Sequence, residues 1–183
     1  KAPVKPVIPA NSAWASSSID ALAEQQYAAH QLTPASDADP HTLLRRLHFD
    51  LTGLPPSLES MSQFSEAWKS NPEQAIASEV DGLLDTPQYG ERWARHWLDV
   101  ARYAESAGKE VDLSFPNAWR YRNYVIDAFN SDKPYDEFIR EQIAGDLLPA
   151  KTDKEWAEHL IATGFLALGP KALIEQNPRQ FQA

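Results

Sequence analysis

The longest helical pattern in the sequence lies at residues 86–105, which read TPQYGERWARHWLDVARYAE. Thr86 followed by Pro87 is typical of a helix start, because threonine can cap free backbone amides and proline is tolerated at the first helical position. Apolar side chains then recur at the three- and four-residue spacing that forms one face of a helix. The stretch therefore predicts a long helix that begins at Pro87 and ends near Glu105.

Similar start and stop signals divide most of the remaining sequence into helices. Caps and prolines stand at the expected beginnings, and glycine or proline follows several of the expected ends. The further predicted helices are residues 18–30, 39–51, 57–69, 71–84, 118–129, 132–145 and 152–164, and their expected capping residues are Ser18, Asp39, Ser57, Asn71, Asn117, Asp132 and Thr152. We therefore predict a compact all-α domain of about seven to eight helices.

The composition excludes several kinds of protein. With 43% hydrophobic and 23% charged residues, the 183-residue chain has the make-up of one globular domain. Because it has no cysteine, it cannot itself form a disulfide, a thiolate zinc site or a covalent haem attachment, and we expect no cofactor in this chain. A net charge of −9 argues against nucleic acid as a partner, since nucleic acids bind basic surfaces. No run approaches the roughly 18–20 apolar residues of a membrane helix, so we expect no membrane insertion.

The two ends of the sequence look like connections to other regions. Pro3, Pro6 and Pro9 disfavour a helix, so residues 1–17 are predicted to form an extended, proline-rich linker. The predicted helical domain then covers residues 18–170. Residues 171–183 are expected to lead into a downstream region that this fragment lacks.

Residues 89–138 are rich in aromatic and arginine side chains. They hold 11 of the 19 aromatic residues and five of the nine arginines, and Arg140 follows two residues later. Such enrichment is typical of interfaces and of sites that stack sugars or cations, and also of a large aromatic core with arginine–carboxylate pairs at its rim. Both interpretations stay open. The candidate binding residues are Trp97, Tyr103, Trp119, Arg120 and Arg122.

A polar stripe on the long helix holds the candidate catalytic residues. Four side chains follow one another at spacings of four, three and four, which places them on one helix face: Arg92, His96, Asp99 and Tyr103. His96 with Asp99 can act as a general base with its orienting carboxylate or as a metal ligand, or it can be an ordinary packed histidine. No histidine spacing is characteristic of a metal site, so we expect none. The candidates for catalysis are His96, Asp99, Arg92 and Arg102.

The segment 105–117 is predicted to be a loop between the helix of His96 and the helix of Trp119. It is long for a helix–helix connection, and long loops in compact domains often carry function. We therefore expect any ligand site to lie beneath this loop. No motif in the sequence indicates a particular reaction. The sequence lacks a glycine-rich phosphate loop, a nucleophile elbow and a His-Glu-x-x-His helix.

Several strings together resemble a known family. They are LRRL at 44–47, DLTGLPP at 50–56, YGERWARHWLDVARY at 89–103, NAWRYR at 117–122, KPYDEF at 133–138, EQIAGD at 141–146 and ATGF at 162–165. They resemble the uncharacterised helical domain of large, secreted, planctomycete-type cytochrome c-containing proteins. The resemblance covers about residues 18–170, and it brings no established catalytic residue that can be carried onto this sequence.

The resemblance implies a biological setting. Proteins of this kind typically carry a signal peptide, a cytochrome c-like domain, this domain and a second uncharacterised domain, so the expected location is periplasmic or secreted. Family members generally continue into a Cys-x-x-Cys-His haem motif, which this chain lacks. Haem c is therefore expected only elsewhere in the full-length protein, where His96 could serve as an axial ligand.

Two hypotheses follow for the function. The leading one is a binding and scaffold domain that positions a redox domain or a polymeric substrate. Its partners would be neighbouring cytochrome c-like domains of the same polypeptide or a carbohydrate. The alternative is a catalytic domain, an oxidoreductase or a polysaccharide-active enzyme, with a site around His96 and the 105–117 loop. The sequence does not decide whether the chain is an enzyme.

Overall fold

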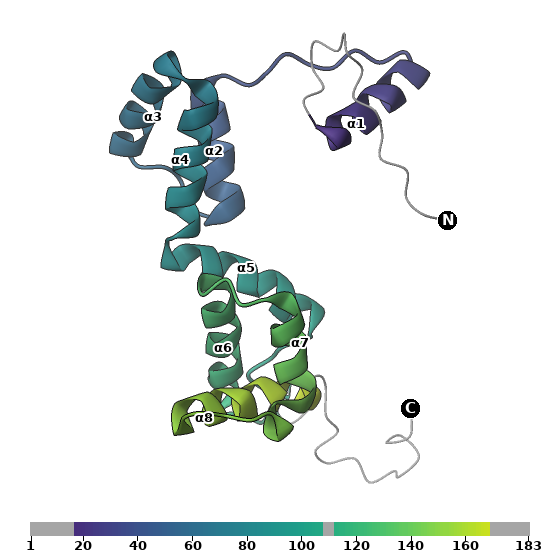
Figure 1. Cartoon of the computed structure of the whole chain (residues 1–183), viewed down its shortest axis with the longest axis vertical. Coiled ribbons are helices and arrows are strands. Elements are labelled where there is room, and N and C mark those ends of the chain that lie inside the picture. The colour runs from purple at the N-terminus through teal and green to yellow at the C-terminus, as the bar shows by residue number, and fades with distance from the viewer. Residues whose placement is uncertain (1–16, 108–111, 169–183) are drawn as a thin grey trace. The chain divides into compact units, whose positions relative to one another are not determined.

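The computed structural model describes residues 17–107 and 112–168 (Figure 1). Within these residues it contains eight α-helices and two short 3₁₀ helices, and a single antiparallel bridge between Ser106 and Ser114. The all-α prediction is therefore confirmed. None of the described helices is long and apolar enough to cross a bilayer. The predicted linker, apart from Ser17, and the predicted C-terminal segment lie outside the described residues.

By its internal contacts the chain forms two units, residues 1–39 and residues 40–183. The first unit contains helix α1 (Ser18–Ala29). The Ser17 side chain accepts a hydrogen bond from the Asp20 amide, and the Asp20 carboxylate accepts one from the Ser17 amide. The capping residue is thus Ser17 and not Ser18 as predicted, because Ser17 has the extended backbone that turns a side chain toward the first helical amides.

The second unit begins with three helices that pack on one another: α2 (Pro40–Leu51), α3 (Leu58–Ser70) and α4 (Pro72–Leu84). Their shared core consists of Leu44, Phe64 and Ala75. The predicted caps at Ser57 and Asn71 are confirmed, since each side chain accepts a hydrogen bond from the amide three residues later. Local sequence signals therefore place these three helices correctly.

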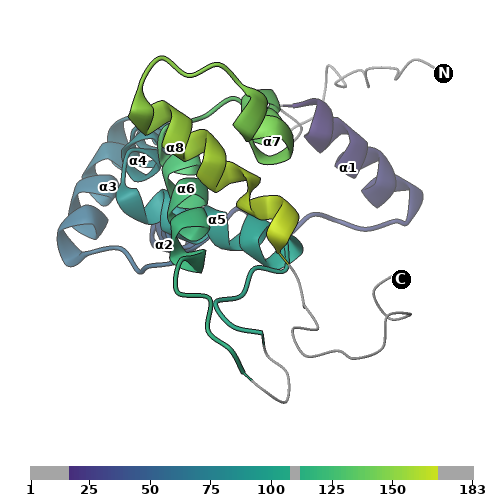
Figure 2. The ribbon, with the colours of Figure 1, turned by 90° about the horizontal axis from the view of Figure 1, so that it is seen from below.

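The remaining elements of the second unit surround an aromatic core. They are α5 (Pro87–Val100), α6 (Ala118–Asn130), α7 (Tyr135–Ala144), α8 (Asp153–Ala162) and the 3₁₀ helices η1 (Gly145–Leu147) and η2 (Thr163–Ala167). Helix α5 lies along α6, and α8 crosses α6 (Figure 2). The buried core side chains are Ala94, Leu98, Tyr121, Tyr124, Val125, Ala128, Phe138 and Ala162. Thr152 caps α8 by accepting from the Glu155 amide, as predicted.

Helix α5 ends at Val100, five residues before the predicted end at Glu105. Arg102 adopts a left-handed conformation with φ of 60°, and the Tyr103 amide donates to the Leu98 carbonyl at 2.9 Å. This arrangement closes the helix without the glycine that usually marks such an end. The prediction was wrong here, and Tyr103 is not part of a helical stripe with His96.

The boundary between α6 and α7 also differs from the prediction. Asp132 has φ of 48°, and the Lys133 amide donates to the Ala128 carbonyl at 2.9 Å, so Asp132 ends α6 and does not open α7. Short polar side chains tolerate this left-handed conformation better than most. At the helix starts, Thr86 and Asn117 stand at the capping positions as predicted, but neither side chain makes a capping hydrogen bond.

The backbone of α8 packs tightly against Gly145 at the start of η1, and this contact leads to a prediction about stability. A Cβ atom at Gly145 would lie 2.2 Å from the His159 carbonyl oxygen and 2.9 Å from its carbon, both in backbone that cannot easily move. We expect Gly145→Ala to lower the free energy of unfolding by about 2–3 kcal/mol, measured by urea denaturation.

Gly82 provides the matched control, because a Cβ atom there would meet nothing within 4 Å. Since Gly82 lies inside α4, Gly82→Ala should leave stability unchanged or raise it by up to about 1 kcal/mol. Equal stability changes in the two variants would contradict the close packing of α8 against η1.

Candidate functional site

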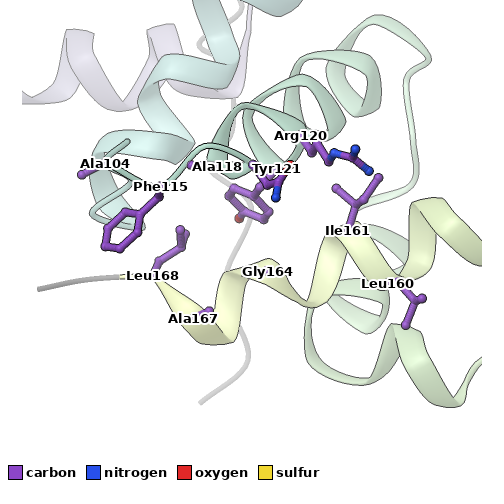
Figure 3. Close-up of a pocket in the computed structure, with 11 residues that line it drawn as sticks. Ala104, Phe115, Ala118, Arg120, Tyr121, Leu160, Ile161, Gly164, Ala167 and Leu168 are labelled. Atoms are coloured by element: carbon purple, nitrogen blue, oxygen red, sulfur yellow. The ribbon is translucent and has the colours of Figure 1, made fainter. Parts of the chain in front are cut away.

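Two adjoining cavities lie between α6 and the C-terminal elements α8 and η2. The first has a volume of about 360 Å³, and its lining includes Phe115, Ala118, Arg120, Tyr121, Ile161 and Leu168. In Figure 3 the Phe115 and Leu168 side chains lie together at one end, and Arg120 lies near Ile161 at the other. Most of this lining is apolar.

The second cavity, of about 530 Å³, has a more polar lining. It includes Trp119, Arg120, Asn123, Asp127, Glu158 and Ile161. Because Arg120 and Ile161 line both cavities, the two form the apolar end and the polar end of one groove. We call the residues that line either cavity the α6–α8 groove.

Four side chains at four-residue spacing follow α6 along the polar end: Trp119, Asn123, Asp127 and Ser131. Trp119 is 45% exposed, and the Arg120 guanidinium lies 5.5 Å from the centre of its ring. Among the described residues, the structure gives the Asn123 and Asp127 side chains no hydrogen-bond partner. Their amide and carboxylate groups are therefore available to a ligand.

The floor of the apolar end is fixed by a buried hydrogen-bond network. Trp97 Nε1 donates to the Tyr121 hydroxyl at 2.9 Å and to Gln142 Oε1 at 3.2 Å, and the Tyr121 hydroxyl donates to Gln142 Oε1 at 2.5 Å. Gln142 Nε2 in turn donates to the Phe138 carbonyl at 3.0 Å. Burial raises the pKa of Tyr121 to about 12. The network therefore binds α5, α6 and α7 together and leaves the Tyr121 hydroxyl fully engaged.

Glu141 is a buried carboxylate behind the polar end of the groove. It accepts hydrogen bonds from the Tyr124 hydroxyl at 2.7 Å and from Lys133 Nζ, and its other oxygen lies 3.7 Å from His159 Nε2. Burial, followed by the bond to Glu141, raises the pKa of Tyr124 well above its usual range. Tyr124 and Lys133 also line the groove. Sequence reasoning missed this cluster, because its members come from three helices and from the connection between α6 and α7.

The structure does not bring the four candidate catalytic side chains into one cavity. His96 and Asp99 are exposed on α5 and have no hydrogen-bond partner among the described residues, and His96 meets only the edge of Trp93, with ring centres 5.4 Å apart. Arg92 is half-buried, with its Nε unpaired and its side chain against Gly53. Arg102 is exposed at the helix end. Their catalytic assignment stays a prediction.

The candidate binding residues fall into two groups. Trp119 and Arg120 line the α6–α8 groove, whereas Trp97 belongs to the buried network beneath it. Tyr103 donates a hydrogen bond to Glu105 at 2.9 Å, and Arg122 forms an ion pair with the same carboxylate. Burial and the bond to Glu105 raise the pKa of Tyr103 to about 12. These two side chains therefore anchor the start of the 105–117 loop.

The 105–117 loop ends at the apolar end of the groove, where Phe115 and Asn117 contribute to the lining. The cavity thus lies beside the loop that the sequence singled out. Asn123 and Asp127 were missed, although their four- and eight-residue spacing from Trp119 on a predicted helix would have found them.

A second polar cluster joins α2, α3 and α4. His48 Nε2 lies 2.8 Å from Glu79 Oε1 and 3.4 Å from the Ser60 hydroxyl, which donates to the same Glu79 oxygen at 3.1 Å. A serine nucleophile needs the two partners on opposite ring nitrogens of the histidine, and here both face Nε2. The cluster therefore holds three helices together. No group of three potential metal ligands occurs within residues 17–107 and 112–168.

Comparison with known proteins identifies one family. The family model PSCyt2, described as a protein of unknown function (DUF1549), matches residues 18–183. The match agrees with the family expected from the sequence strings, whereas the multidomain, secreted setting stays a prediction. No curated protein and no solved structure matches the chain.

The Glu141 cluster generates a prediction about stability. The Lys133 and Glu141 side chains are only 20% and 10% exposed, so removing the lysine charge leaves a buried carboxylate without its cation. We expect Lys133→Met to lower the free energy of unfolding by about 3 kcal/mol in urea denaturation.

Lys154→Met serves as the control, because Lys154 pairs with Glu158 on the exposed surface of α8. Such surface pairs contribute little, so a change below about 0.5 kcal/mol is expected. If Lys133→Met were as stable as Lys154→Met, Glu141 would not depend on its buried partner.

Proposed function

The chain belongs to the PSCyt2 family of proteins of unknown function, and we propose that it acts as a binding and scaffold domain of a larger extracytoplasmic protein. In this role it positions a polymeric substrate or a neighbouring cytochrome c-like domain that carries haem c. The haem would be attached to that neighbour, since this chain has no cysteine for a thioether bond.

The observation that carries the proposal is the α6–α8 groove. Its two cavities of about 360 and 530 Å³ meet at Arg120 and Ile161, so it is elongated and suits an extended ligand or a protruding edge of a partner. Exposed Arg120 lines both cavities, and the neighbouring exposed Trp119 lines the polar one. Tryptophan and arginine at the centre of a contact surface are the residue types that contribute most to binding.

The chemistry around the groove supports binding more than proton transfer. The two tyrosine hydroxyls beneath the groove are held in place by buried partners, since Tyr121 is bonded to Gln142 and Tyr124 to Glu141. Burial raises the pKa values of both tyrosines further above neutral pH, where an ordinary tyrosine hydroxyl is already protonated. Side chains held in this way lose little conformational freedom when a ligand binds, so the surface is preorganised for binding.

The test is a binding measurement by calorimetry. The chain is titrated with the separately produced cytochrome c-like domain of the same polypeptide and with soluble polysaccharides. Arg120→Glu, which reverses the charge shared by both cavities, should weaken the binding that is observed by at least about tenfold. Arg95→Glu is the matched control, because Arg95 is an exposed arginine on α5 that lines neither cavity.

Two results would contradict the proposal. One is that no partner binds, or that Arg120→Glu binds as tightly as the wild type. The other is turnover of a substrate that His96→Ala abolishes while the variant stays folded, which would favour the catalytic alternative around His96.

A further inference from the structure

We infer that the polar end of the α6–α8 groove binds a neutral saccharide chain. This inference rests on the proposed binding function and names the class of ligand. It is carried by three features of the groove: an exposed aromatic platform, unpaired polar groups beside it, and a balance of charge.

Trp119 supplies the platform. It is 45% exposed although it lines a cavity, so much of its ring is open to solvent. The face of an aromatic ring is electron-rich, and the C–H groups on the apolar face of a sugar ring are weakly positive, so the two stack favourably. The Arg120 guanidinium beside the ring adds hydrogen-bond donors at the edge of the platform.

Asn123 and Asp127 supply directed hydrogen bonds. They follow Trp119 at intervals of four residues, which separates successive side chains by about 6 Å along the helix axis. The Asn123 amide can both donate and accept, and the Asp127 carboxylate accepts from two neighbouring hydroxyls. Neither has a partner among the described residues, so both are free to bind a sugar unit beside the one stacked on Trp119.

The charges of the polar end favour a neutral ligand. Lys154 lies 3.6 Å from Glu158, and Lys133 is paired with Glu141, so two of the cations are already neutralised. The remaining Arg120 faces the same cavity as Asp127. A strongly anionic or cationic polymer would meet repulsion from one of these groups, whereas hydroxyl groups can bond to both signs.

The apolar end extends the site beyond a single sugar. Phe115, Ala118 and Leu168 line the adjoining cavity on the other side of Arg120 and Ile161, and they offer an apolar surface for further units of the chain. A polymer is therefore a better fit than a monosaccharide, because only a chain contacts both ends at once.

The test uses affinity electrophoresis and calorimetry with two sets of probes. The neutral set is soluble xylan, hydroxyethyl cellulose and dextran, and the charged set is alginate and chitosan. We expect binding to at least one neutral probe, with little dependence on salt because no net charge is neutralised. Trp119→Ala should weaken this binding at least about tenfold, since it removes the stacking platform.

Two further variants keep the test informative. Trp156→Ala is the matched control, because Trp156 is 53% exposed on α8 and lines neither cavity, so its loss should leave binding unchanged. Asp127→Asn keeps the size of the side chain and the fold, and it should weaken binding several-fold by removing charge-assisted hydrogen bonds.

The inference is overturned if no neutral probe binds, if only charged probes bind, or if Trp119→Ala binds as tightly as Trp156→Ala. These results can be distinguished from results that would contradict the proposed scaffold function. If the cytochrome c-like domain binds through Arg120 while every polysaccharide fails, the scaffold function stands and the saccharide inference falls.

Discussion

The hydrogen bonds among Trp97, Tyr121 and Gln142 are the constraint on which the aromatic core of α5, α6 and α7 depends. Each of the three side chains comes from a different helix, and each polar atom would be left unsatisfied in an aromatic core if one partner were removed. The rings of Phe138 and Trp97 pack edge to face beside the network, with their centres 5.0 Å apart. The helices are therefore fixed by direction-specific bonds as well as by apolar packing.

This constraint explains how the groove is formed. Helix α5 is held to α6 by the network and also at the Gly90 amide, which donates to Asn130 Oδ1 at 2.8 Å. Helix α8 is held against η1 by the close approach of Gly145 to His159. With both neighbours fixed, the outer face of α6 between them stays partly uncovered, and that face carries Trp119. The α6–α8 groove is thus a consequence of how the core is built.

Local signals predicted much of the fold, and tertiary contacts decided the rest. Ser57, Asn71 and Thr152 could be predicted as caps because a cap depends on a few neighbouring residues. The end at Arg102 could not, since arginine has no preference for the left-handed conformation, and Asp132 suits a helix start as well as this conformation. Composition pointed to Trp119 and Arg120, which line the α6–α8 groove. The pairing of Glu141 with Lys133 could not be predicted, because it depends on how α7 packs against the segment that precedes it.

The most direct test of the central role of the network is the free energy of unfolding as a function of pH for Tyr121→Phe, with exposed Tyr135→Phe as the control. At neutral pH we expect Tyr121→Phe to lose about 1–3 kcal/mol. Because the pKa of Tyr121 rises from 10.0 unfolded to about 12 folded, its contribution is complete below pH 10 and is lost as the pH rises toward 12, and Tyr121→Phe should reduce that loss. Equal stability of wild type and Tyr121→Phe at every pH would contradict the account.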